Sequence, residues 1–86
     1  MSYEGTLPIV REGENIGSLK ITRDGLFTAF SGRCRDTGSI MRLSVYGEGE
    51  GYLGVMLPEN GELKIEKRLS RAAMAGFPNK PKFAGP

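Results

Sequence analysis

The side chain best suited to covalent chemistry is Cys34, the single thiol among 86 residues. It lies between Arg33 and Arg35, and neighbouring cations lower the pKa of a thiol. In an extended strand, however, both arginines point to the face opposite the sulfur. Cys34 shares its own face with Leu26 and Phe30, so we expect a buried structural cysteine. A reactive thiol and a contact between molecules are the alternatives.

The sequence contains no histidine. Its absence removes the usual general base near neutral pH and the commonest metal ligand. Catalytic Ser-His-Asp and Cys-His arrangements are therefore impossible, and one cysteine cannot form a four-thiolate zinc site. We predict that the protein is not an enzyme and that it has no catalytic residues, no cofactor and no metal site.

Four carboxylates occur near the middle of the chain, at Glu48, Glu50, Glu59 and Glu62. Paired carboxylates can perform acid–base catalysis or bind Ca²⁺. Their spacing matches no calcium loop, because no Asp-x-Asp-x-Asp run precedes a distant glutamate. Residues 47–51, Gly-Glu-Gly-Glu-Gly, are typical of a solvated connector. We expect an acidic loop without a chemical role.

A second group of polar side chains is basic and aromatic. It comprises Arg33 and Arg35 on one predicted strand, with Arg42 and Tyr46 on the next. A basic sheet face with an aromatic side chain is typical of small barrels that bind single-stranded nucleic acid. The plain interpretation is a solvated outer face that nearby carboxylates neutralise. A protein-binding face is the third possibility.

The strands that must position these residues follow from period-2 alternation of apolar side chains. The most secure element is a hairpin over residues 52–69, in which Asn60-Gly61 supplies the positive φ angles of a tight turn. Pro58 should end its first strand, because proline donates no ladder hydrogen bond. Asp24-Gly25 marks a second hairpin. Strands are predicted over residues 6–11, 16–23, 26–35, 40–46, 52–57 and 63–69.

The predicted strands are joined by short connections, which make neighbours antiparallel and favour a meander. An even number of strands can close on itself, which removes exposed edges. We predict a single all-β domain over residues 1–76, built as a closed or partly open barrel of about six strands. A two-sheet sandwich is the alternative. Ser70 is expected to cap a short helical turn that ends at Gly76.

Residues 77–86 form a predicted C-terminal tail rich in proline and lysine. Such a tail can dock into an aromatic groove of a partner as a polyproline helix. It can also be disordered, or it can pack back on its own barrel. The residues expected to make contacts in this tail are Phe77, Pro78, Lys80, Pro81 and Lys82.

Length and charge set further limits. Eighty-six residues form one domain, and a net stability on the order of 5 kcal/mol is expected. The net charge is +2, and Lys80 and Lys82 account for the whole excess. The sequence has no apolar run long enough to cross a membrane, and it lacks the pattern of a signal peptide. We therefore expect a cytoplasmic protein without a membrane partner.

Part of the chain resembles a group of small bacterial β-rich domains without an assigned function. The resemblance covers approximately residues 16–69 and implies a β fold and a bacterial source. It implies no activity, cofactor or site residue, because its motif consists mainly of glycines, a proline and core apolar residues. The motif residues are Gly25-Leu26-Phe27, Cys34, Gly38, Arg42-Leu43, Leu53-Gly54-Val55-Met56-Leu57-Pro58, Gly61 and Lys67-Arg68-Leu69.

These observations together predict a non-catalytic module for protein interaction or assembly. Its partner would be another protein or a second copy of the chain. A small barrel that binds single-stranded nucleic acid through Arg33, Arg35, Arg42 and Tyr46 is a less favoured alternative. A barrel that binds a small ligand is a further one, although six strands leave little interior space beyond side chains.

Overall fold

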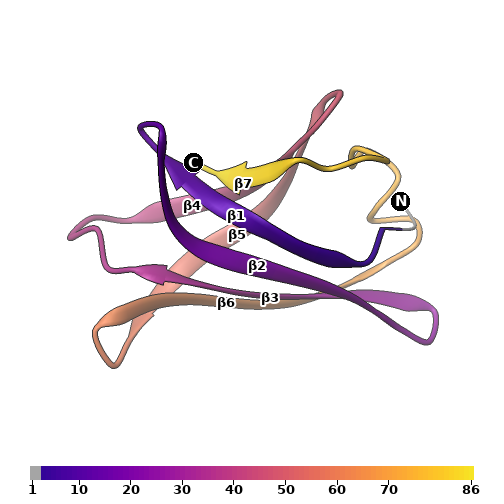
Figure 1. The fold of residues 1–86 in the computed structure, drawn as a ribbon. Helices are drawn as coiled ribbons and strands as arrows, with labels where there is room; N and C mark the ends of the chain where they lie inside the picture. The colour runs from indigo at the N-terminus through magenta and orange to yellow at the C-terminus, as the bar shows by residue number, and fades with distance from the viewer. Residues whose placement is uncertain (1–2) are drawn as a thin grey trace.

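The computed structural model describes residues 3–86 as a closed barrel of seven strands, with no helix in that range (Figure 1). This confirms the predicted all-β small barrel over the sandwich. Within the same residues, no helix is long and apolar enough to cross a membrane. The strands are β1 (Gly5–Arg11), β2 (Glu14–Asp24), β3 (Phe27–Arg35), β4 (Met41–Tyr46), β5 (Glu50–Glu59), β6 (Glu62–Ser70) and β7 (Phe83–Gly85).

The order of strands around the barrel differs from the predicted meander. It is β1-β2-β3-β6-β5-β4-β7, so two three-stranded meanders face each other and β7 joins them. Strand β3 pairs with β6 along nine residue pairs, from Phe27–Ser70 to Arg35–Glu62. Both strands have nine residues, so every residue of β3 has a partner on β6. Strand β4 has only six residues and could not pair with the whole of β3. The link over residues 36–40 is long enough to cross the barrel end.

The hairpin of β5 and β6 forms as predicted. Asn60 and Gly61 have φ angles of 51° and 82°, as a two-residue reversal requires. Pro58 does not end β5, which continues to Glu59. Pro58 lies opposite Leu63, one pair beyond the pair that closes the turn. Neighbouring pairs alternate in their hydrogen bonding, so the missing N–H of Pro58 loses no bond to β6.

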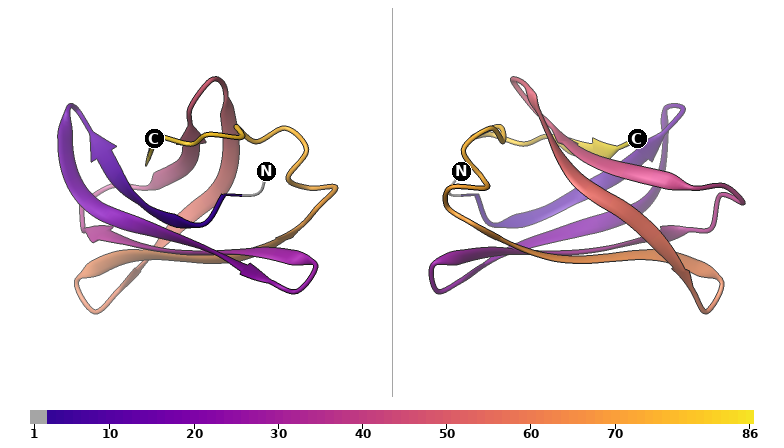
Figure 2. Two further views of the ribbon diagram at one scale, coloured as in Figure 1. Left: turned by 45° about the vertical axis from the view of Figure 1, so that its right-hand side comes forward. Right: turned by 180° about the vertical axis from the view of Figure 1, so that it is seen from behind.

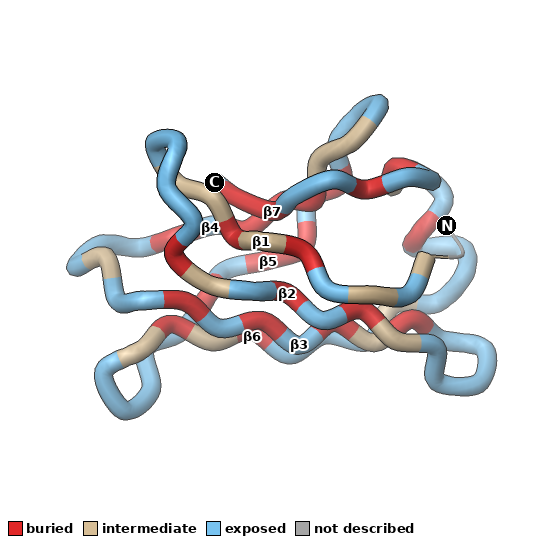
Figure 3. Tube along the Cα trace, viewed as in Figure 1, coloured by how far each residue is buried: buried red, intermediate tan, exposed pale blue. Residues whose placement is uncertain are grey.

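The barrel interior is a packed core and not a ligand cavity. Inward side chains of all seven strands meet there, and Figure 3 shows buried positions alternating with exposed ones along the strands. Side chains fill the interior of a small barrel of this kind. The largest fully buried side chains are Phe30, Ile9, Leu19, Ile21, Leu43, Met74 and Val45.

Cys34 belongs to this core, as predicted. It is 2% exposed, and its Sγ lies 3.8 Å from Sδ of Met56. Burial raises the pKa of the Cys34 thiol, and the carboxylates of Asp36 and Glu62 raise it further. These surroundings stabilise the unreactive thiol. The expected inward partner Leu26 instead sits in the β2–β3 turn and is 88% exposed, because β3 begins one residue later.

Residues 71–76 form consecutive turns at one end of the barrel, where a short helical turn was predicted. Ser70 caps them as expected, because its Oγ accepts a hydrogen bond of 3.3 Å from the Ala73 N–H. Met74 is 1% exposed and belongs to the core cluster. The ring of Phe77 packs 5.9 Å from that of Phe30. The segment therefore plugs the barrel end.

The C-terminal tail packs back on the barrel, which was the third of the outcomes left open. Figure 2 shows the chain leaving β6 and crossing the molecule before it returns as β7. Strand β7 pairs antiparallel with β4, and parallel with β1 at Ile9–Ala84. The Tyr46 ring stacks on Phe83 at 5.1 Å, and its hydroxyl donates a hydrogen bond of 2.6 Å to the carbonyl of Pro86.

The predicted tail contacts divide into buried and exposed side chains. Pro78 and Pro81 are buried and Phe77 is half-buried, so all three pack against the protein itself. Lys80 and Lys82 are exposed. Prolines that are buried in their own barrel do not present a polyproline surface to a partner. This arrangement argues against recognition through the tail.

Glu48 anchors the tail to the loop between β4 and β5. Its carboxylate accepts a hydrogen bond from the backbone N–H of Asn79. This bond, together with the backbone N–H of Glu48 itself and that of Lys80, lowers the pKa of Glu48 below its ordinary value. The loop expected to be a solvated connector therefore has a structural contact.

The shifted pKa of Glu48 predicts a pH-dependent contribution to stability. A carboxyl group whose pKa is depressed in the folded state stabilises it above the unfolded pKa, and this stabilisation disappears as the pH falls through the folded pKa. The difference in unfolding free energy between wild type and Glu48→Gln should therefore shrink between about pH 5 and pH 3. Urea denaturation at several pH values measures it. Glu50→Gln controls for the charge lost, and a difference independent of pH would contradict the prediction.

Candidate functional site

The predicted arginine face does not exist as one surface. Arg33 and Arg35 lie on β3, whereas Arg42 lies on β4, and β6 and β5 separate these strands around the barrel. Arg33 is 3.7 Å from Glu62, and Arg35 forms an ion pair of 2.8 Å with Glu14. The arginines of β3 are thus neutralised by acidic neighbours.

Tyr46 is also committed to a structural role. It shares β4 with Arg42, but its ring stacks on Phe83 and its hydroxyl binds the chain end at Pro86. A base-stacking platform needs an uncovered aromatic face beside the cations that bind phosphate. The structure separates the two, so the four residues predicted for nucleic-acid binding do not form a site together.

The weakest ladder between two long strands of the barrel lies between β5 and β6. Among the described residues these strands share three residue pairs, from Leu57–Lys64 to Glu59–Glu62. Beyond Leu57, β5 follows β4 while β6 stays with β3. The two strands diverge from their common turn, as the right-hand view of Figure 2 shows. We call this opening the β5–β6 seam.

Hydrogen-bond alternation shows which backbone groups of β6 point into the β5–β6 seam. The pair Glu59–Glu62 closes a two-residue turn, so it is a hydrogen-bonded pair. Every second residue of β6 then directs its N–H and C=O toward β5. Lys64 uses these groups to pair with β5, but Glu66 and Arg68 have no strand partner on this side within residues 3–86.

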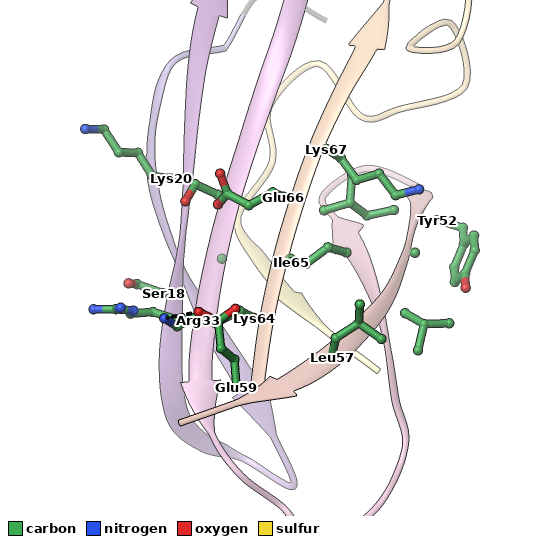
Figure 4. Close-up of a pocket in the computed structure, with 15 residues that line it drawn as sticks. Ser18, Lys20, Arg33, Tyr52, Leu57, Glu59, Lys64, Ile65, Glu66 and Lys67 are labelled. Carbon is green, nitrogen blue, oxygen red and sulfur yellow. Dashed lines mark hydrogen bonds and ion pairs between the residues drawn. The ribbon is translucent and has the colours of Figure 1, made fainter. Parts of the chain in front are cut away.

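A groove runs along the β5–β6 seam and onto the outer face of β3 and β6 (Figure 4). Its volume is about 1080 Å³. Buried Leu53 and Ile65 and the backbone of Gly54 contribute to its surface. Tyr52 and Leu57 project from β5 and are 53% and 65% exposed. The groove therefore combines exposed apolar side chains with unpaired strand backbone.

Lys67 lies in the seam itself. By alternation it belongs to the inward face of β6, between buried Ile65 and half-buried Leu69. It is nevertheless exposed, because β5 has diverged at this level. Its side chain extends toward Gly54 of β5, where an added Cβ would lie 3.0 Å from Lys67 Cε. Within residues 3–86, Lys67 makes no ion pair or side-chain hydrogen bond.

Sequence reasoning missed this site, although one signal was present. In the run Leu63, Ile65, Lys67, Leu69, a lysine takes an inward position among aliphatic residues. An inward-pointing charge is one way in which proteins protect an open strand edge from uncontrolled pairing. The anomaly in the alternation thus marked the point where the sheet opens.

A second exposed apolar pair occurs at the β2–β3 turn. Leu26 is 88% and Phe27 39% exposed. The Arg68 guanidinium lies over the Phe27 ring, 4.9 Å from its centroid, and 3.3 Å from the Asp24 carboxylate. Phe27 is thus partly covered by its own neighbours, and we place the candidate site in the β5–β6 seam.

Comparisons with protein-family models, with curated proteins and with solved structures give no match to this chain. The resemblance to small bacterial β-rich domains therefore stays a prediction. Within residues 3–86, no three Cys, Asp or Glu side chains come together in a way that could hold a metal ion.

Proposed function

We propose that this protein is a non-catalytic protein-interaction module that binds an extended segment of a partner protein. The segment adds as a strand to the edge of β6 within the β5–β6 seam. The observation that carries the proposal is the unpaired backbone of Glu66 and Arg68 beside a groove with exposed apolar walls. Strand addition uses such backbone groups for affinity and the adjoining side chains for specificity.

The edge of β6 suits an incoming strand better than the edge of β5. Strand β6 is regular along its whole ladder with β3. Strand β5 carries a register shift opposite Leu43 and Ser44, and Gly54 there has a φ of 152°. Such a bulge interrupts the even spacing of donors and acceptors along an edge. We therefore assign the backbone hydrogen bonds to β6 and side-chain contacts to β5.

Other features support a protein partner over the two alternatives. The cations that a nucleic acid would need are divided between strands and partly paired with carboxylates. The barrel interior, where a small ligand would bind, is filled by core side chains. An exposed strand edge with apolar walls has neither limitation.

Replacing Glu66 by proline tests strand addition directly. Proline removes the N–H that points into the seam but no hydrogen bond to β3. Heptapeptides selected from a random displayed library on the wild-type protein should bind Glu66→Pro about tenfold more weakly, through one lost hydrogen bond and the bulk of the ring. Glu66→Ala, which changes only the side chain, should stay within about twofold. Fluorescence anisotropy with labelled peptides measures both affinities.

The unfolding midpoint of each variant confirms that the barrel is intact, and Arg68→Pro repeats the test at the second seam-facing residue. Equal affinity of the selected peptides for wild type and for both folded proline variants would refute strand addition to β6. Failure of the wild-type protein to enrich any peptide would refute it as well.

A further inference from the structure

We infer that the seam recognises a segment that has an acidic residue with an apolar residue two positions away on each side. Lys67 forms an ion pair with the acidic residue. This inference rests on the proposed function and specifies its partner. The observation behind it is that the exposed ammonium group of Lys67 lies on the inward face of β6, where its neighbours Ile65 and Leu69 are aliphatic.

The backbone pattern determines which side chains would face each other. An antiparallel strand on β6 forms hydrogen-bonded pairs at Glu66 and Arg68, so the residue opposite Lys67 lies in a non-hydrogen-bonded pair. Side chains are closest in such pairs, with Cβ atoms about 4.5–5.5 Å apart. The neighbours two positions away lie opposite Ile65 and Leu69. All three partner side chains lie on the same face of the sheet as Ile65, Lys67 and Leu69.

The charge of the groove favours a carboxylate at the central position. Lys64 is paired with Glu59 at 3.3 Å and Arg33 lies 3.7 Å from Glu62. Lys67 has no such partner within the described chain, and a Cβ added at Gly54 would lie 3.0 Å from its Cε. A carboxylate opposite Lys67 gains an ion pair, whereas a cation there meets uncompensated positive charge.

The apolar positions follow from the surroundings of Lys67. Ile65 is 5% and Leu53 4% exposed, and both border the groove. Leu69 is half-buried and packs against the core cluster. Aliphatic side chains of a partner placed opposite Ile65 and Leu69 would therefore meet an apolar lining. A polar side chain at the same positions would lose water without gaining a partner.

A second copy of the chain fits the edge of β6 poorly. Two β6 strands from two copies can pair antiparallel about a twofold axis perpendicular to the sheet, so that both inward faces lie on the same side. The residue on this axis then lies directly opposite the same residue of the other copy. Within the open part of β6 that residue is Glu66, Lys67 or Arg68, and like charges directly opposite each other are destabilising. The symmetric pairing is therefore disfavoured, and the occupant is a segment of another protein.

Three synthetic peptides test the inference on the full-length protein. They share the sequence acetyl-Thr-Val-Thr-X-Thr-Val-Thr-amide, with X as Asp, Asn or Lys. For the wild type we expect the affinity to decrease in the order Asp, Asn, Lys, with about fivefold between Asp and Asn at low salt, as for a well-formed exposed ion pair. In Lys67→Glu the order should reverse. Lys82→Glu, which changes an exposed charge outside the groove, should leave the order unchanged.

The outcomes separate the two proposals. Equal binding of all three peptides to the wild type, with weakening by Glu66→Pro, would overturn the charge selectivity and retain strand addition. The same would follow if Lys67→Glu kept the wild-type order. Binding that Glu66→Pro and Arg68→Pro leave unchanged, or no binding of any of the three peptides at millimolar concentration, would overturn both.

Discussion

Replacing Gly17 by alanine should strongly destabilise the barrel, because the added methyl group would clash with the backbone of β3. Gly17 lies on β2 between Ile9 of β1 and Cys34 of β3. A Cβ at Gly17 would lie 2.1 Å from the Arg33 carbonyl oxygen and 2.5 Å from Cys34 Cα. Both atoms belong to the backbone of β3, so no side-chain rotation relieves the clash, and the two strands must separate.

We expect this substitution to reduce the unfolding free energy by about 3 kcal/mol or more, because overpacking against backbone exceeds ordinary core strain. That is over half of a total stability on the order of 5 kcal/mol. Urea denaturation followed by circular dichroism measures the loss.

Gly76→Ala is the matched control for Gly17→Ala. No described atom lies within 4 Å of a Cβ at Gly76, and its φ is not positive. Its stability should therefore change by less than about 0.5 kcal/mol. Equal unfolding midpoints for the two variants would show that β2 and β3 do not approach as closely as the structure indicates.

Removing residues 77–86 should abolish cooperative folding. The deletion takes away β7, which joins β4 to β1, and leaves both strands with an open edge. It also removes the Phe77 ring from Phe30 and the fully buried Ala84. Loss of one large core side chain alone destabilises a protein by about 3–5 kcal/mol, which approaches the expected total.

Thermal unfolding by calorimetry or circular dichroism checks this expectation. The double variant Lys80→Ala and Lys82→Ala removes the two exposed charges of the tail but none of its buried contacts. It should unfold within about 2 °C of the wild type, as is usual for surface changes. A truncated chain that unfolds cooperatively near the wild-type temperature would show that β7 is dispensable. If the truncated chain is unfolded as expected, any loss of partner binding by it results from unfolding and does not show that the tail recognises the partner.

The outcome for the predicted binding residues shows where sequence reasoning stopped. Arg33, Arg35, Arg42 and Tyr46 were correctly placed on the two strands β3 and β4. They were expected to share a face only because consecutive strands were assumed to be neighbours. Pairing of β3 with β6 separates them. Which strand becomes a neighbour depends on matching backbone over long distances in the chain, and local alternation carries no information about this.

The local features of this protein could be predicted from its sequence. Alternation placed six strands, Asn60-Gly61 specified a tight turn, and Cys34 was assigned to the core, because burial on one face and backbone freedom act over a few residues. The strand order, the role of β7 and the opening of the β5–β6 seam became visible in the folded barrel alone. Each depends on which distant backbone groups meet, and Lys67 becomes accessible solely because β5 leaves β6 at that level.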